Sequence, residues 1–345
     1  MLSNQLARSM EIGMQMPRIM YGTAWKKERT AELVCQAVKA GFRGIDTACQ
    51  PKHYREDLVG QAIKSLISEG VVKREELYIQ TKFTSVDGQD PSLTLPYDPS
   101  SPIEEQVKQS FETSLKNLGV EYVDAVVLHS PLRNREVGFY FETGFRFPFT
   151  SRPFSLPDGS LFMSLIFAYS NSQQDTLKAY LTLSRFLSTK QIRHLGISNC
   201  YDPLLLKWLI DSVAEYSSKH QEEPEVRVGI VQNRWYEGNG WDWDVYDICQ
   251  AHGIRYQSFW TLTGSPTLLK QPFLINLAAK YGLTPEQTIY KLCQLWGITP
   301  LCGTSSLAHA KEAVSVENAT GLMSSTEEVI ELWNAMGGRY KEGGH

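Results

Sequence analysis

The chain has 345 residues, of which 42% are hydrophobic, and a formal net charge of -4 at pH 7. That length and that apolar fraction are enough for one large domain with a sizeable core, although length alone would also allow two domains. A weakly acidic chain gives no electrostatic basis for binding nucleic acid or an anionic membrane surface.

The cysteines are scattered without the CxxC or cysteine–histidine spacing of a metal site. They are Cys35, Cys49, Cys200, Cys249, Cys293 and Cys302. This use of cysteine is typical of reduced thiols inside the cell. The first 16 residues contain no apolar segment of the secretory type, and no stretch reaches the length of a membrane span. We therefore expect a cytoplasmic protein without a bound metal or a membrane contact.

Short apolar segments that are typical of buried strands alternate with helical patterns along the chain. The strands are expected over residues 18–23, 42–46, 77–82, 122–129, 192–197, 228–232, 254–259 and 298–302. The clearest helical patterns cover 31–40, where Gly41 ends the helix, and 56–68, and another begins near Ile103 after a long polar loop. Eight strands that alternate with helices predict an α/β fold, a single (β/α)8 barrel formed by residues 1–345.

One segment, residues 134–172, interrupts this alternation. Eight of the fourteen phenylalanines lie between Phe139 and Phe167, and the regular pattern resumes at Gln174. A structureless loop of this length is uncommon in a compact domain, and an exposed aromatic run would be a sticky surface. The segment is interpreted as an insertion after the fourth strand: a lid over the substrate pocket, a partner surface, or a translated intron. Its apolar core, 161–168, is too short to cross a bilayer.

Chemically active side chains stand at the ends of successive predicted strands. Asp46 ends the second strand, Lys82 the third and His129 the fourth, while Ser198 and Asn199 end the fifth. Right-handed crossovers place the carboxyl ends of all the parallel strands at one rim of a barrel. Because barrel enzymes build their active sites at that rim, the pattern predicts an active site there.

Several segments, in this order, resemble those of the aldo-keto reductase family. They are the stretch around Asp46, Thr81-Lys82, 128–131, 192–199, Val231-Gln232, 264–266 and 303–305. The resemblance implies a barrel enzyme that reduces an aldehyde or a ketone with a nicotinamide cofactor. It also implies a catalytic set of Asp46, Tyr54, Lys82 and His129.

Elementary acid–base chemistry explains this set. A phenol is a weak acid, with an unperturbed pKa of about 10. A nearby ammonium stabilises the phenolate, and a buried carboxylate can hold that ammonium in place. Tyr54 would thus donate the proton, Lys82 and Asp46 would tune it, and His129 would orient the carbonyl.

The assignment of the acid has an alternative in the neighbouring residue. Counting back from Glu56 and Gly60 places His53, not Tyr54, at the tyrosine position of the family. We assign Tyr54, because a phenol is the donor that a lysine–aspartate pair can tune, and His53 stays the alternative. The other three side chains could have structural roles instead: a helix N-cap for the carboxylate, a rim lysine and a hydrogen-bonded core histidine.

By the same resemblance, one group of residues would contact the cofactor. This group is Thr23, Asp46, Ser198, Asn199, Gln232, Trp260, Gly264, Ser265, Gly303, Thr304, Ser305, His309 and Lys311. Ser198, Asn199 and Gln232 would hydrogen-bond the carboxamide of the nicotinamide. Trp260 would stack on its ring and fix which face meets the substrate, although an aromatic at a strand end is also common as packing.

The phosphates of the cofactor would lie at two loops. Residues 264–267 would cover the pyrophosphate, and the backbone N–H groups of 303–306, before a helix, are suited to a phosphate. The lysine and arginine that the family uses for the 2′-phosphate align with Gly303 and His309. His309 and Lys311 could replace them, so NADP(H) is the expected cofactor and NAD(H) the alternative.

Other features bear on the class of protein. No GxGxxG motif follows the first strand, which argues against a Rossmann domain. The expected partner is a small carbonyl compound, and the expected state a monomer or a weak oligomer. Trp235, Tyr236, Trp241 and Trp243 could line the substrate pocket or simply pack. A non-catalytic nucleotide-binding barrel, acting as an interaction or regulatory subunit, is the alternative to an enzyme.

Overall fold

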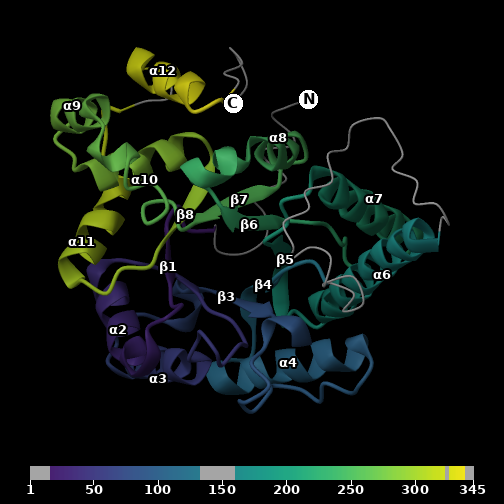
Figure 1. The fold of residues 1–345 in the computed structure, drawn as a ribbon. Helices are drawn as coiled ribbons and strands as arrows, with labels where there is room; N and C mark the ends of the chain where they lie inside the picture. The colour runs from purple at the N-terminus through teal and green to yellow at the C-terminus, as the bar shows by residue number, and fades with distance from the viewer. Residues whose placement is uncertain (1–15, 133–159, 323–325, 339–345) are drawn as a thin grey trace.

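The computed structural model describes residues 16–132, 160–322 and 326–338, with the side chains of 160–170 and of Ala335 outside the description. Eight parallel strands form a closed barrel in which each strand pairs with the next and β8 pairs with β1 (Figure 1). The strands are β1 (Met20–Gly22), β2 (Gly44–Asp46), β3 (Tyr78–Phe83), β4 (Val123–Leu128), β5 (Ile192–Ser198), β6 (Ile230–Arg234), β7 (Arg255–Phe259) and β8 (Ile298–Cys302). The predicted (β/α)8 barrel is confirmed, and each predicted strand overlaps an observed one.

Helices surround the strands in Figure 1. They are α2 (Thr30–Ala40), α3 (Glu56–Ser68), α4 (Ile103–Leu118), α6 (Ser160–Ser188), α7 (Pro203–Lys219), α8 (Trp243–Ala251), α9 (Pro272–Lys280), α10 (Pro285–Leu295), α11 (Leu307–Ser315) and α12 (Glu327–Ala335). Helix α2 buries Leu33, Val34, Ala37 and Val38, which recur at helical spacing on one face. Gly41 ends it with a φ of 122°, a conformation that a side chain would strain.

Helix α6 differs from the sequence prediction, because it begins inside the predicted insertion. Its 29 residues start at Ser160, so residues 160–172 continue the helix that follows. No glycine or proline interrupts the chain from Ser160 to Ser188, which explains the continuity. The rest of the insertion, through residue 159, lies outside the described residues. Within the described residues, no helix is long and apolar enough to cross a membrane.

Side chains inside the barrel change from apolar to polar along the strand direction. Alternate residues of a strand point to the same side, so Tyr78, Gln80 and Lys82 of β3 all face the interior. The apolar layer consists of Met20, Tyr78, Ala125, Val127 and Ile230. A larger apolar core fills the space between the strands and the helices. The polar end of the interior is where the predicted catalytic residues lie.

A cluster of tryptophans attaches the last helix to the barrel. Trp235 is fully buried, and its ring centroid lies 4.7 Å from that of Trp241, 5.7 Å from Trp243 and 5.8 Å from Trp296. Trp333 of α12 lies 4.4 Å from Trp243 and 4.6 Å from Trp296. These five residues are called the tryptophan cluster. Of the two roles predicted for Trp235, Trp241 and Trp243, the structure supports packing.

Candidate active site

A buried ion pair forms the base of the site. The Lys82 Nζ atom, near the end of β3, donates to Asp46 Oδ2 at 2.6 Å and to the carbonyl oxygen of Thr47 at 2.9 Å. Both charged side chains are almost completely buried. Burial lowers the pKa of Lys82, and the charge of Asp46 opposes that effect. The aspartate is therefore an ion-pair partner in the barrel interior and does not act as a helix N-cap.

Tyr54 lies above this pair and beside His129. Its ring centroid is 5.2 Å from Lys82 Nζ and 5.8 Å from the imidazole centroid, with the two rings edge to face. Burial raises the pKa of Tyr54, and the negative charge of Asp46 raises it further. The prediction from the sequence rests on the ammonium of Lys82, which would lower the pKa of the phenol. In the structure burial and the carboxylate outweigh it, so the phenol stays protonated and keeps a proton to donate.

His129 is held both at its ring and at its backbone. The imidazole Nδ1 atom lies 2.7 Å from Thr84 Oγ1, and the backbone carbonyl oxygen of His129 accepts from Asn199 Nδ2 at 2.8 Å. Burial lowers its pKa to about 3, with contributions from the charges of Lys82 and His53. The ring is therefore neutral at physiological pH, which suits a hydrogen-bond partner for a carbonyl group.

His53, the alternative acid, has a different neighbour. Its ring stacks on Trp25, with centroids 3.7 Å apart and planes inclined by 34°, and the Trp25 N–H donates to the His53 carbonyl oxygen at 2.8 Å. Its Nδ1 atom is buried without a hydrogen-bond partner among the described residues. Of the two adjacent residues, Tyr54 is the one whose ring contacts His129 and lies near Lys82.

A buried carboxylate fixes the chain just after Tyr54. Glu56, the first residue of α3, accepts from Thr81 Oγ1 at 2.5 Å and from Asn117 Nδ2 at 3.2 Å. Burial raises its pKa. These bonds tie the start of α3 to β3 and α4. Gly60 allows that close approach, since a Cβ atom there would lie 2.1 Å from the Asn117 carbonyl oxygen.

Gln232, predicted to bind the carboxamide, also contacts the buried pair. Its Nε2 atom donates to Asp46 Oδ1 at 3.0 Å and to Gln257 Oε1 at 2.8 Å. Gln80 donates to the same aspartate oxygen at 2.8 Å. Gln80 and Gln257 are not among the residues predicted from the sequence. Their signal is an amide at the centre of a short buried strand, where each polar group needs a partner.

The other predicted carboxamide ligands bond to neighbouring strand ends. Ser198 Oγ donates to the Gln232 carbonyl oxygen at 2.6 Å. Asn199, with a φ of 51°, donates from Nδ2 to His129. Thr23 Oγ1 donates to the Asp46 carbonyl oxygen at 2.9 Å. These bonds bring the ends of β1, β2, β4, β5 and β6 together at one rim.

Trp260 stands exposed just after β7. Its side chain is 44% exposed, and its backbone has a φ of 60°. Two neighbouring groups pack beside the indole: the Tyr236 ring lies 5.1 Å and the Arg234 guanidinium 5.0 Å from its ring centroid. A Cβ atom at Gly264 would lie 2.7 Å from the Tyr236 ring, so glycine is required there. Such an open ring suits stacking on a planar ligand.

The predicted phosphate loop links β8 to α11. Gly303, Thr304 and Ser305 precede the N-cap Ser306, whose hydroxyl accepts from the His309 N–H. His309 and the next predicted cation, Lys311, lie exposed on this helix. Ser265, the remaining predicted contact, is buried in the loop after β7.

A further cation, Lys26, is absent from the sequence prediction and reaches this loop. Lys26 Nζ donates to the Gly303 carbonyl oxygen and lies 4.0 Å from where a Cβ atom of residue 303 would be. Lys26 therefore places an ammonium beside the position where the family has its lysine. The absence of a lysine at position 303 indicates that another cation is needed there. The sequence of the loop around Lys26 does not show that this side chain supplies it.

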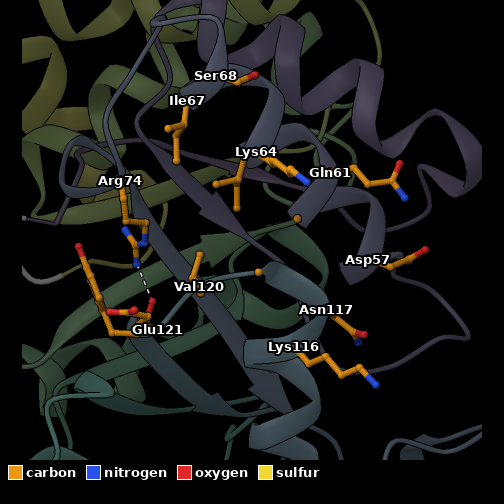
Figure 2. Close-up of a pocket in the computed structure, with 14 residues that line it drawn as sticks. Asp57, Gln61, Lys64, Ile67, Ser68, Arg74, Lys116, Asn117, Val120 and Glu121 are labelled. Atoms are coloured by element: carbon orange, nitrogen blue, oxygen red, sulfur yellow. Dashed lines mark hydrogen bonds between the residues drawn. The ribbon is translucent and has the colours of Figure 1, made fainter.

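A separate groove lies on the helical shell. Its volume is about 830 Å³, and it runs between α3 and α4 (Figure 2). Lys64, Arg74, Lys116 and Glu121 are among the residues that line it. None of the predicted site residues lines this groove, so it is distinct from the site at the barrel rim.

Comparison with known proteins gives the family. A sequence model of the Aldo/keto reductase family matches residues 10–300. The chain therefore belongs to this family of barrel oxidoreductases. The resemblance stated from the strand-end motifs is confirmed.

Individual relatives are distant. The chain is 26% identical over 284 residues to a glycerol 2-dehydrogenase (NADP(+)) of Saccharomyces cerevisiae, covering 81% of this chain and 76% of that protein. It is 26% identical over 296 residues to an NAD(P)H-dependent D-xylose reductase of Pyricularia oryzae, covering 81% and 78%. A silkworm (Bombyx mori) aldo-keto reductase structure has a TM-score of 0.65 and 22% identity, covering 93% and 85% of the two chains. This last likeness shows a shared fold.

Proposed function

We propose that the protein reduces a small aldehyde or ketone to the alcohol with NADPH, and that Tyr54 donates the proton. The observation that carries the proposal is the position of the Tyr54 ring, next to His129 and 5.2 Å from the ammonium of a buried ion pair. The named activities of the related dehydrogenase and xylose reductase support the same reaction class.

The side chains have complementary roles in this reaction. A nicotinamide cofactor, when bound, would supply the hydride for the carbonyl carbon. Tyr54 and His129 hydrogen-bond the carbonyl oxygen, and the Tyr54 hydroxyl gives it a proton as negative charge develops there. Lys82 then stabilises the phenolate, and Asp46 keeps that ammonium in place. We infer that Thr84 donates to Nδ1 of His129, which leaves the imidazole proton on Nε2 for the substrate.

Exposed and cationic groups at the rim fit a dinucleotide. Trp260 presents an open ring for stacking, and Gln232 borders both the aspartate and the predicted carboxamide position. We infer that Lys26, with His309 and Lys311, supplies the positive charge for the 2′-phosphate and hence the preference for NADP(H) over NAD(H). The free cysteines suit a reducing compartment such as the cytoplasm.

The test compares the parent with a Tyr54→Phe protein, using NADPH and an aromatic aldehyde such as nitrobenzaldehyde. We expect kcat to fall roughly 10²- to 10⁴-fold, the usual share of a general acid, while the Kd for NADPH, from fluorescence quenching, stays near that of the parent. Equal turnover of the two proteins would refute the role of Tyr54. A parent that binds NADPH but reduces no carbonyl compound would favour a non-catalytic binding protein.

A further inference from the structure

Two glutamines from opposite sides of the barrel form a reciprocal amide pair. Gln80 of β3 donates from Nε2 to Gln257 Oε1 at 2.8 Å, and Gln257 of β7 donates back to Gln80 Oε1 at 2.9 Å. Strands β3 and β7 are four strands apart in either direction around the barrel. Both side chains are 0% exposed. The pair therefore spans the interior at its centre.

Gln80 of this pair contacts the catalytic carboxylate, and so does Gln232. Gln80 Nε2 also donates to Asp46 Oδ1 at 2.8 Å, and Gln232 Nε2 donates to the same oxygen at 3.0 Å while contacting Gln257 Oε1 at 2.8 Å. The other oxygen, Oδ2, accepts from Lys82 at 2.6 Å. The two oxygens thus have separate partners: amides bind one and the ammonium binds the other.

We propose that Gln80 and Gln257 are positioning residues for the reaction. Gln80 donates to Asp46 Oδ1, takes up part of its charge and leaves Oδ2 to face Lys82, while Gln257 holds the amides of Gln80 and Gln232 in place. The inference rests on the proposed function, in which the Asp46–Lys82 pair tunes Tyr54. Neither glutamine touches Tyr54 in the described contacts, so both act through the aspartate.

Burying these amides costs free energy unless their polar atoms are paired, so their presence inside the barrel calls for a reason. The layer beneath is apolar, and a barrel interior can be filled by hydrocarbon alone. Amides in that position are tolerated only when every polar atom is paired. Here the Gln257 amide also rests on methionine sulfur, at 3.5 Å from Met16 Sδ and 3.6 Å from Met20 Sδ. The Nε2 donors of Gln80, Gln232 and Gln257 thus all have acceptors, and Asp46 Oδ1 is the charged one.

The electrostatic consequence has a definite sign. The groups that face Tyr54 are Asp46 from β2, Lys82 from β3 and His129 after β4, and Glu56 acts on the lysine. The charge of Asp46 raises the pKa of Tyr54. The amides of Gln80 and Gln232 both donate to Oδ1 and reduce the field of that charge. Loss of the Gln80 donor would therefore raise the phenol pKa further and make it a weaker acid.

The decisive variant replaces both members of the pair, as Gln80→Met with Gln257→Met. Removing one amide leaves the other member of the pair unsatisfied, which destabilises the protein. Replacing both with side chains of similar volume avoids that cost, although the Gln232 N–H that donates to Gln257 Oε1 loses its acceptor. For the double variant we expect kcat to fall about tenfold, because hydrogen bonds to an ionised group are the strong ones. We expect the basic limb of the kcat profile to move up by about one pH unit.

A control variant separates this role from a structural one. Gln294→Met removes a buried amide on α10, whose Nε2 atom bonds to the Arg18 carbonyl oxygen, and should leave the pH profile unchanged. If the double methionine variant does not fold, Gln80→Leu with Gln257→Leu is measured instead.

The outcomes are distinct. A parent enzyme without carbonyl turnover would defeat the proposed function and this inference with it. An active parent whose folded double variant has the same kcat and the same basic limb would defeat this inference alone. A lower plateau with a basic limb at higher pH would support it.

Discussion

The rings of His53 and Tyr54 have different partners although the residues are adjacent in the chain. The His53 ring stacks on Trp25 at 3.7 Å, whereas the Tyr54 ring meets His129 at 5.8 Å. Counting back from Glu56 and Gly60 favours the histidine as the family's acid. The structure places the ring of the following residue, Tyr54, near Lys82.

His53→Phe tests this difference directly. The variant preserves an aromatic ring to stack on Trp25 and removes the imidazole. We expect kcat with NADPH and an aldehyde to stay within about threefold of the parent, since a group outside the proton transfer lacks the 10²- to 10⁴-fold share of a general acid. A loss as large as that of Tyr54→Phe would make His53 the acid.

Lys26→Met tests the source of the preference for NADPH. Loss of the ammonium beside Gly303 should raise the Kd for NADPH about tenfold, the value of one charge-assisted contact, and leave the Kd for NADH almost unchanged. Titration of tryptophan fluorescence measures both constants. Lys27→Met, with an exposed lysine next in the chain, is the matched control.

A rescue variant makes the same test specific. Gly303→Lys is sterically open, because its Cβ atom would meet only Lys26 Nζ, at 4.0 Å. In the Lys26→Met background it should restore most of the discrimination between the two nucleotides. If Lys26→Met raises the Kd for NADPH and the Kd for NADH by the same factor, the ammonium does not bind the 2′-phosphate.

Asp46→Asn tests the ion pair through stability. The change leaves Lys82 buried without its counter-charge, which should lower the free energy of unfolding by about 3 kcal/mol at neutral pH. Burial lowers the folded-state pKa of Lys82 below its ordinary value of 10.5, so the folded protein binds fewer protons than the unfolded chain. The deficit should therefore shrink as pH rises toward that value.

Urea unfolding at neutral and at alkaline pH measures this effect. The double variant Asp46→Asn with Lys82→Met removes the unpaired charge and should recover most of the stability without activity. A single variant as stable as the parent at neutral pH would contradict the prediction.

His129→Asn tests the neutral imidazole. The folded-state pKa of about 3 lies below the ordinary value of 6.5, so this group contributes stability above pH 6.5 that is lost as pH falls toward 3. The parent should lose at most about 1.4 kcal/mol per pH unit across that window from this one group, and the variant should show a flatter decline. Urea unfolding at neutral pH and at about pH 5 measures the difference. His252→Asn, at an exposed histidine, should keep the slope of the parent.

The barrel and the positions of the polar side chains at its strand ends could be predicted because they depend on local patterns. Short apolar segments ending in Asp46, Lys82 and His129 identify buried parallel strands and their rim. The start of α6 at Ser160 could not be placed, because the aromatic composition of the insertion hides the helical pattern that continues through it.

Contacts between distant segments account for what the sequence misses. Gln80 and Gln257 are separated by 177 positions, and Lys26 and Gly303 by 277. Neither spacing carries a local signal, since only closure of the barrel brings these residues together. The rise in the pKa of Tyr54 escapes prediction for a related reason: it depends on burial, which a list of neighbouring charges does not give.

The tryptophan cluster gives the fold its own optical reporter. Five of the eight indoles of the chain have centroids 4.4 to 5.8 Å from a neighbour in the cluster, close enough for their excited states to couple. Near-ultraviolet circular dichroism of the native protein should be dominated by these rings, and undocking of α12 would erase much of that band. Nucleotide binding at Trp260, outside the cluster, would instead quench tryptophan fluorescence and leave the dichroic band unchanged. The two signals can therefore follow folding and binding separately in the same sample.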